Sequence, residues 1–186
     1  MRLALAVLCF AIGVAGCASS SPPKANAGTH IDVVMGPTAP GSDFYALDDD
    51  GQKIAHAMQM VHNGQIQAAI DGPINEVIAK FEKEYAGKRV YSARGAAEGI
   101  VYAALVNNTE GTKPEEHIVV IGPSWAMAYW ARSYALTEMN RTTEAEADLK
   151  RALALSPMDS QYKNELAYLI MRRGEIAQSL ALYKEA

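Results

Sequence analysis

From residue 51 onward, apolar residues recur at intervals of three and four, the spacing of one face of an α-helix. A second stretch with this spacing begins at Ile66, is interrupted at Gly72-Pro73 and continues to Tyr85. The pattern predicts two helices between residues 51 and 85, the second of them broken. The first ends at Asn63-Gly64 and carries its apolar side chains at Ile54, Ala57, Met58 and Val61.

A third helix is expected in the middle of the chain, followed by a run that does not keep helical spacing. The run Ile118–Ile121 is β-branched, which favours a short strand or an extended segment. The apolar island Ile31–Met35 is expected either to add a strand to another segment or to pack on the first helix. The third helix has small or apolar residues on one face, at Ala93, Ala96, Ala97, Ile100, Val101, Ala104 and Leu105.

Residues 124–186 repeat one helix–turn–helix pattern with a period of 34 residues, in the units 124–157 and 158–186. Asn140 and Gly174 stand at the turns, and both residue types tolerate the left-handed backbone that ends a helix. We expect two consecutive antiparallel helix pairs, the second incomplete at residue 186. Small residues recur where the paired helices cross closely, at Ser133, Ala145 and Ala152, and at Ala167, Ser179 and Ala186.

The helix starts in this region have their own signals. Thr143-x-x-Glu146 matches a capping box, in which a Thr side chain and a Glu side chain satisfy each other's backbone N–H groups. Asp159 or Ser160 is expected to cap the next helix.

The register of small residues and turns resembles the tetratricopeptide repeat (TPR) family, and Pro157 stands where that family closes a unit. The family's Trp is absent, with Tyr129 and Lys163 in its place. The resemblance implies an all-α, TPR-like α-solenoid of antiparallel helix pairs. Residues 44–123 are then a divergent helical region, in which Gly99, Tyr102 and Pro123 keep the period but the second helix is lost.

In the resembled family, five positions of each first helix line a concave groove that binds a protein or peptide partner. Aromatic and Met side chains suit such recognition, because they supply a large area at little entropic cost. The alternative is that Trp130 and a tyrosine pack on the tether or on the neighbouring unit. Carried over residue by residue, the groove consists of Met127, Trp130, Tyr134, Thr137, Glu138, Gln161, Asn164, Tyr168, Met171 and Arg172.

The start of the chain reads as a targeting segment. Arg2 precedes an apolar run, and Val14-Ala15-Gly16-Cys17 resembles the lipobox of bacterial lipoproteins. The resemblance implies a signal peptide at 1–16, a lipidated Cys17 and a flexible tether over 17–43 that is rich in Ser, Pro, Ala and Gly. An ordinary secretory signal is the alternative. In a host with two membranes, the expected location is the outer membrane, facing the periplasm.

Charge and side-chain chemistry narrow the functional classes. The net charge of −4 argues against a nucleic-acid partner. The four histidines are not spaced as helical metal pairs, and no metal or cofactor is expected. Asp48–Gly51 is expected to form a turn at a helix N-terminus and not a calcium loop, because Ala46 and Ala57 would stand at ligand positions.

The sequence therefore predicts a lipid-anchored, periplasmic protein that is not an enzyme and that mediates protein–protein interaction as a scaffold or accessory factor of an envelope complex. Two alternatives remain. A serine hydrolase centred on Ser124 is suggested by Gly122-x-Ser124-x-Ala126 after an apolar run, although every histidine lies upstream of that serine. The chain would otherwise serve as a structural spacer that binds nothing.

Overall fold

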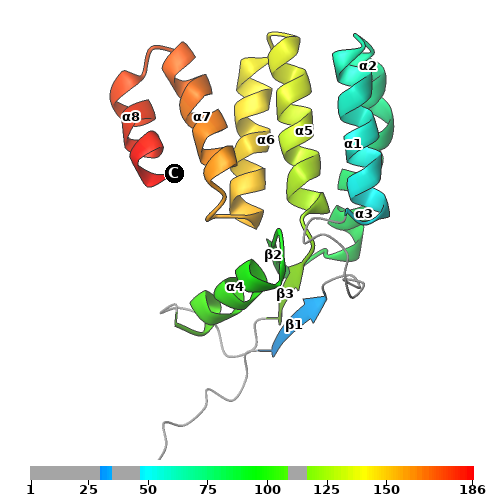
Figure 1. The fold of residues 1–186 in the computed structure, drawn as a ribbon, viewed down its shortest axis with the longest axis vertical. Helices are drawn as coiled ribbons and strands as arrows, with labels where there is room; N and C mark the ends of the chain where they lie inside the picture. The colour runs from blue at the N-terminus through cyan, green and yellow to red at the C-terminus, as the bar shows by residue number, and fades with distance from the viewer. Residues whose placement is uncertain (1–29, 35–46, 109–116) are drawn as a thin grey trace, which may run out of the picture.

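The computed structural model describes residues 30–34, 47–108 and 117–186 (Figure 1). The described chain is mostly helical, which confirms the coarse expectation from the sequence. Its helices are α1 (Asp49–His62), α2 (Ile66–Ala69), η1 (Ile70–Ile74), α3 (Asn75–Glu84), α4 (Ala96–Asn108), α5 (Ser124–Glu138), α6 (Thr142–Leu155), α7 (Ser160–Arg172) and α8 (Ile176–Glu185). Its strands are β1 (His30–Val34), β2 (Arg89–Ser92) and β3 (His117–Ile121).

The C-terminal helices form two hairpins, α5 with α6 and α7 with α8 (Figure 1). Their turns are built as the sequence predicts, because Asn140 has a φ of 59° and Gly174 a φ of 90°. The small residues at the expected crossing positions are buried, with the exception of the exposed Ala186. Figure 1 shows α8, α7, α6, α5 and α1 side by side, so the hairpins continue into the first helix of the chain.

The N-terminal helices also fold back on one another. α1 ends before Asn63-Gly64, and the chain returns through α2, η1 and α3. The segment η1 is a short π-helical turn in which Gly72 leaves helical geometry and Pro73 interrupts the ladder of hydrogen bonds. The predicted pair of helices is therefore present, and the break falls at the predicted Gly-Pro.

One of the two predicted helix caps is present. Asp159 is the N-cap of α7, and its carboxylate accepts a hydrogen bond of 3.1 Å from the Tyr162 backbone N–H. The capping box at Thr143 is wrong, because α6 begins at Thr142 without a side-chain cap. Glu146 is instead buried and forms ion pairs with Lys150 and Arg173.

A three-stranded parallel sheet stands at one end of the helices, in the order β1-β3-β2. This sheet is an addition to the all-helical architecture that the sequence suggested. Ile118–Ile121 and the island at Ile31 are both strands, and Ile31 pairs with Ile118, while Met35 lies outside the described residues. β2 was not predicted. α4 is the crossover that two neighbouring parallel strands require.

The orientation of α4 differs from the one its apolar pattern suggests. Tyr102 is fully buried against the sheet, where it stacks on Tyr91 at a centroid distance of 5.3 Å. Its hydroxyl donates a 2.6 Å hydrogen bond to Glu98. Because the aromatic ring supplies the largest apolar area of the helix, it faces the sheet, and Ile100 and Val101 turn outward.

One continuous core runs from α1 through α5 to α7. The face of the sheet that carries Val119 and Ile121 is part of this core. Polar contacts also hold the sheet to the helices. The Ser156 hydroxyl, after α6, donates to the Ser92 carbonyl of β2, and the Ser92 hydroxyl donates to the Gly122 carbonyl at 2.8 Å. No helix within the described residues has both the length and the apolar character needed to cross a bilayer.

Candidate functional site

A groove lies between α5 and α7, with α6 beneath it. Its cavity has a volume of about 380 Å³, and Leu149 of α6 is its buried floor. The other lining residues are Trp130, Ser133, Tyr134, Thr137 and Glu138 of α5, Asn140 of the following turn, and Glu165, Tyr168, Leu169 and Arg172 of α7. We call this cavity the α5–α7 groove.

The groove continues toward the sheet as a second hollow of about 180 Å³. Trp130 lines both hollows, and Met127 lies one helical turn before it on the same face of α5. The stretch from Met127 to Glu138 covers about 16 Å of helix axis. The remaining lining residues of this second hollow are Leu47, Arg94, Pro123, Gln161 and Tyr162.

Aromatic rings form one wall of the α5–α7 groove. Trp130 and Tyr134 have ring centroids 6.3 Å apart, and His62, at the end of α1, lies 5.9 Å from Tyr134. On the opposite side, the Arg172 guanidinium stands over the ring of Tyr168 at 5.9 Å. Tyr168 is 43% exposed, a large fraction for an aromatic side chain. Among the described residues, no other aromatic ring stacks on it.

The indole N–H of Trp130 is buried and has no hydrogen-bond partner in the described part of the chain. Such a donor costs free energy when it is left unpaired, so it is an unusual feature of a folded protein. The indole N–H of Trp125, which lines neither hollow, is buried and unpartnered in the same way, so this feature is not specific to the groove.

The structure brings together most of the groove residues that the sequence predicts. Trp130, Tyr134, Thr137, Glu138, Tyr168 and Arg172 line the α5–α7 groove, and Met127 and Gln161 line its continuation. Asn164 and Met171 are exposed on α7 but line neither hollow. Cys17 lies outside the described residues.

Sequence reasoning missed the floor and two polar positions of the groove. Leu149 belongs to the second helix of its pair, which the family pattern does not assign to the concave surface. Glu165 lies three residues before Tyr168, so helical spacing alone places it on the same face. Asn140 had been recognised only as a turn residue.

Ser124, the centre of the alternative hydrolase hypothesis, is fully buried at the start of α5. Its hydroxyl donates to the carboxylate of Asp48, which also caps α1 by accepting from the Gly51 N–H at 2.7 Å. His62 and His117 have partners elsewhere, the Met58 carbonyl for His62 and the Asp32 carboxylate for His117. The Ser124–Asp48 bond joins the N-terminal ends of α1 and α5.

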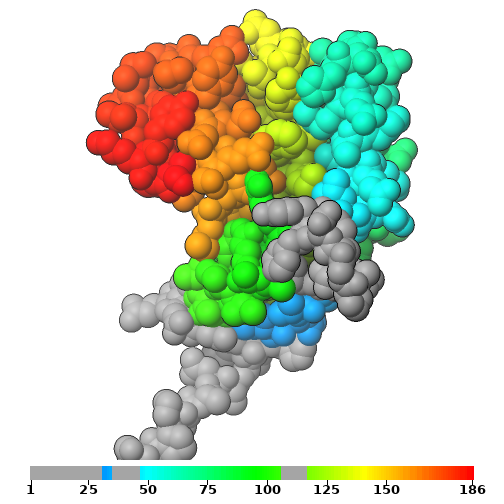
Figure 2. Space-filling model, viewed as in Figure 1, coloured from blue at the N-terminus to red at the C-terminus, as the bar shows by residue number. Residues whose placement is uncertain are grey.

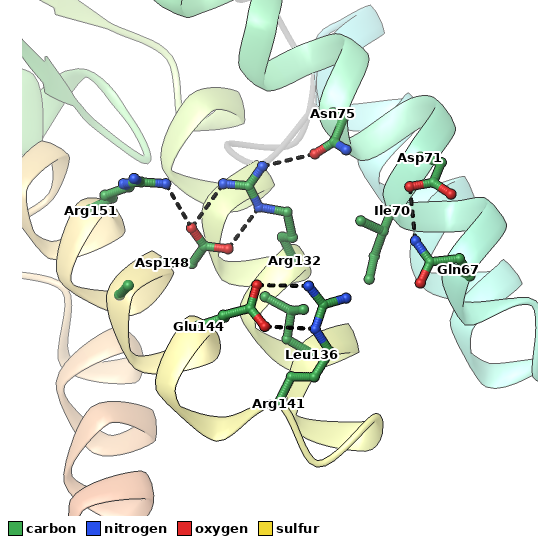
Figure 3. Close-up of a pocket in the computed structure, with 11 residues that line it drawn as sticks. Gln67, Ile70, Asp71, Asn75, Arg132, Leu136, Arg141, Glu144, Asp148 and Arg151 are labelled. Atoms are coloured by element: carbon green, nitrogen blue, oxygen red, sulfur yellow. Dashed lines mark hydrogen bonds and ion pairs between the residues drawn. The ribbon is translucent and has the colours of Figure 1, made fainter.

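A polar cavity of about 410 Å³ lies on the opposite face of α5, between η1 and α6 (Figure 3). Figure 3 shows Arg132 and Arg151 pointing at the buried Asp148. Arg132 donates to both oxygens of Asp148, at 2.7 and 2.8 Å, and to the Asn75 side chain at 2.8 Å. The hydrogen bond to Asp148 is the main reason that the pKa of Arg132 is raised.

The charges of this polar cavity are matched within the chain. Arg141 forms a two-point pair with Glu144, and Asp71 accepts a hydrogen bond from Gln67 (Figure 3). Three arginines face three carboxylates, so the cavity has no net charge to offer a ligand. We therefore assign it a structural role and regard the α5–α7 groove as the candidate site.

Within residues 30–34, 47–108 and 117–186, no three His, Cys, Asp or Glu side chains gather in a way that could hold a metal ion. Comparison with protein-family models, with curated proteins and with solved structures finds no match for this chain.

Proposed function

We propose that this protein is a lipid-anchored component of a bacterial cell envelope that binds a segment of a protein partner in the α5–α7 groove. It carries out no bond chemistry in this proposal. The observation that carries it is the groove itself, in which Trp130, Tyr134 and Tyr168 meet in one cavity although they come from two different helices.

The side chains of the groove suit a peptide better than a small polar metabolite. Aromatic faces on both sides offer stacking surface for apolar side chains, and such anchors dominate the affinity of protein interfaces. Glu138, Glu165 and Arg172 supply polar contacts at the edges.

Contacts within the chain hold the groove walls in place. Such preorganisation favours binding, because little conformational freedom is lost on association. Arg173, after α7, forms an ion pair with Glu146 of α6. The Ser179 hydroxyl of α8 donates to the Ala167 carbonyl of α7 at 2.8 Å. Arg132 and Asp148 join α5 to α6 from the far side of the groove. Each wall is therefore fixed by contacts that lie outside the binding surface.

We also propose that the helices belong to a TPR-like solenoid. Three successive helical hairpins support this, namely α1 with α2–η1–α3, α5 with α6, and α7 with α8. The segment β2–α4–β3 would then be an insertion between the first and second hairpins. The proposed anchor is Cys17, because its preceding residues resemble a lipobox and the Ser/Pro-rich residues after it would form a tether.

The test removes both tyrosines of the groove. The variant Tyr134→Ala/Tyr168→Ala should lose at least about 2 kcal/mol of binding free energy, or roughly thirtyfold in affinity. The partner is captured by crosslinking in cells and recovered with the tagged full chain, and helicity is measured by circular dichroism. Recovery should fall while helicity stays the same.

Tyr183→Ala is the matched control, because Tyr183 of α8 has a similar exposed fraction, 40%, and lines neither hollow. It should recover the partner as well as the unaltered chain does. Unchanged recovery by the double variant would remove the groove from the proposal and place the partner on another surface, whereas failure of the unaltered chain to recover any partner would favour the spacer. Equal losses in both variants would show that the loss is not specific to the groove and would contradict the proposal.

A further inference from the structure

α4 presents an apolar face away from the protein. Ile100 is 70% exposed, Val101 40% and Leu105 47%, and their spacing places them on one side of the helix. The opposite side of α4 is occupied, because Tyr102 packs on the sheet with Val120. The helix therefore has apolar residues on two sides, and the described sheet covers one of them.

β1 extends this surface at the same end of the molecule. Val33 is 55% exposed and shares a face of β1 with Ile31, which packs in the same cluster as Tyr102 of α4, whereas Val34 points to the opposite face of the sheet. Figure 2 shows α4 and β1 next to one another at the end opposite the α5–α6 turn. Four of the twelve large exposed hydrophobic side chains among the described residues, Val33, Ile100, Val101 and Leu105, lie on this side, and a concentration of this kind marks a binding surface. We call it the α4–β1 surface.

We propose that the α4–β1 surface rests on the lipid bilayer to which the chain is anchored. This inference depends on the proposed acylation of Cys17. His30, the first residue of β1, follows Cys17 by 13 positions, a distance that a fully extended chain spans in at most about 45 Å. Of the described elements, β1 is the nearest to the anchor along the chain. The anchor therefore keeps this end of the molecule close to the bilayer, where even a weak surface affinity is effective.

The chemistry of the surface favours lipid over a protein partner. Its exposed large side chains are aliphatic, whereas the anchors of protein interfaces are enriched in Trp, Tyr and Arg. Nearby ion pairs join Arg94 to Asp159 and Asp32 of β1 to His117, while the Glu98 carboxylate accepts from the Tyr102 hydroxyl. An aliphatic face without a cluster of cations suits the boundary between headgroups and acyl chains and needs no anionic lipid.

The experiment measures which residues contact lipid in the anchored protein. The full chain is expressed with its own leader in a bacterium, purified from the membrane fraction and reconstituted into phosphatidylcholine vesicles that contain nitroxide-labelled phosphatidylcholine. Ile100→Cys carries a polarity-sensitive fluorophore, and Cys17 does not compete for it when its thiol is acylated. Met139→Cys is the control, an exposed apolar residue at the C-terminal end of α5, a helix about 22 Å long whose other end adjoins the sheet.

Lipid quenching at Ile100→Cys should exceed that at Met139→Cys by about threefold or more, because an interfacial helix face lies within the reach of the lipid label. Equal quenching at both positions, in protein that floats with the vesicles, would overturn the docking and leave the anchor in place. Protection of Ile100→Cys from both the lipid label and aqueous iodide would overturn it in favour of a protein contact. A chain that fails to float with vesicles would overturn the anchor, and the docking with it.

Discussion

At the scale of single residues, Arg132 and Asp148 form the most buried ion pair of the described helices. The Asp148 side chain is 4% exposed and its charge is met by two hydrogen bonds from Arg132 and one from Arg151. A buried carboxylate of this kind is stable only when it is paired, and its partner depends on it equally. The pair thus fixes how α5 lies against α6.

The variant Asp148→Asn should lose about 3 kcal/mol of unfolding free energy, because it leaves the half-buried Arg132 guanidinium without its counter-charge. Urea denaturation followed by circular dichroism measures this loss. Glu144→Gln is the control, since it breaks a two-point pair of the same geometry that is exposed to water, and we expect no measurable change. Similar losses in the two variants would mean that burial does not set the strength of this pair.

At the scale of secondary-structure elements, the turns of the two C-terminal hairpins share one backbone conformation. The residue that ends the first helix of each pair adopts a left-handed backbone, Asn140 at a φ of 59° and Gly174 at 90°. Few residue types tolerate this conformation, and these two do so for different reasons: Gly lacks a Cβ, and Asn makes local hydrogen bonds. The turn positions were therefore readable from residue type alone.

Gly174→Ala should destabilise the protein by about 1 kcal/mol. The cause is backbone strain and not crowding, because an added Cβ at Gly174 meets no other atom within 4 Å. Gly174→Asn should cost less, because Asn already serves in the equivalent turn. Both are measured as shifts in the midpoint of urea denaturation. An Asn variant as unstable as the Ala variant would show that the left-handed backbone is not the source of the loss.

At the scale of the whole molecule, two buried tyrosines lie at the contact between the N-terminal helices and α5. Burial, with help from a hydrogen bond to Glu82, raises the pKa of Tyr129 to about 12. Burial and Glu84 raise the pKa of Tyr85 to about 12. Tyr129 lies on α5 and Tyr85 follows α3, and Trp125 stacks on both at 6.0 to 6.5 Å. The contact between the N-terminal helices and α5 therefore requires neutral phenols.

This requirement sets the alkaline limit of stability. An unfolded tyrosine ionises near pH 10, so its contribution is complete below that pH and is lost as the pH rises toward about 12. The unfolding free energy should fall over this interval by about 2 kcal/mol for each tyrosine. Urea denaturation at pH 8, 10 and 11.5 measures it. Tyr129→Phe should show a smaller decline, and an equal decline would exclude Tyr129 as a cause.

The sequence by itself determined the parts of this protein that depend on neighbours along the chain. The two C-terminal hairpins, the break at Gly72-Pro73 and the cap at Asp159 follow from periodicity and from the backbone preferences of Gly, Pro, Asn and Asp. Trp130 and Tyr168 were also placed in one groove, but only through the resemblance to the TPR family, from which the groove positions were carried over.

Only the tertiary structure decided features in which distant segments compete for the same partner. α4 has apolar residues on two sides. The sequence pattern could not show that Tyr102 would pack against the sheet and that Ile100 would be exposed. β2 is four residues long and carries no pattern of its own, so it is a strand only because β3 lies beside it. Glu146 matched a cap signal, yet it pairs with Lys150 on its own helix and with Arg173, distant in sequence. Local preferences amount to about 1 kcal/mol, and burial against a distant surface exceeds them.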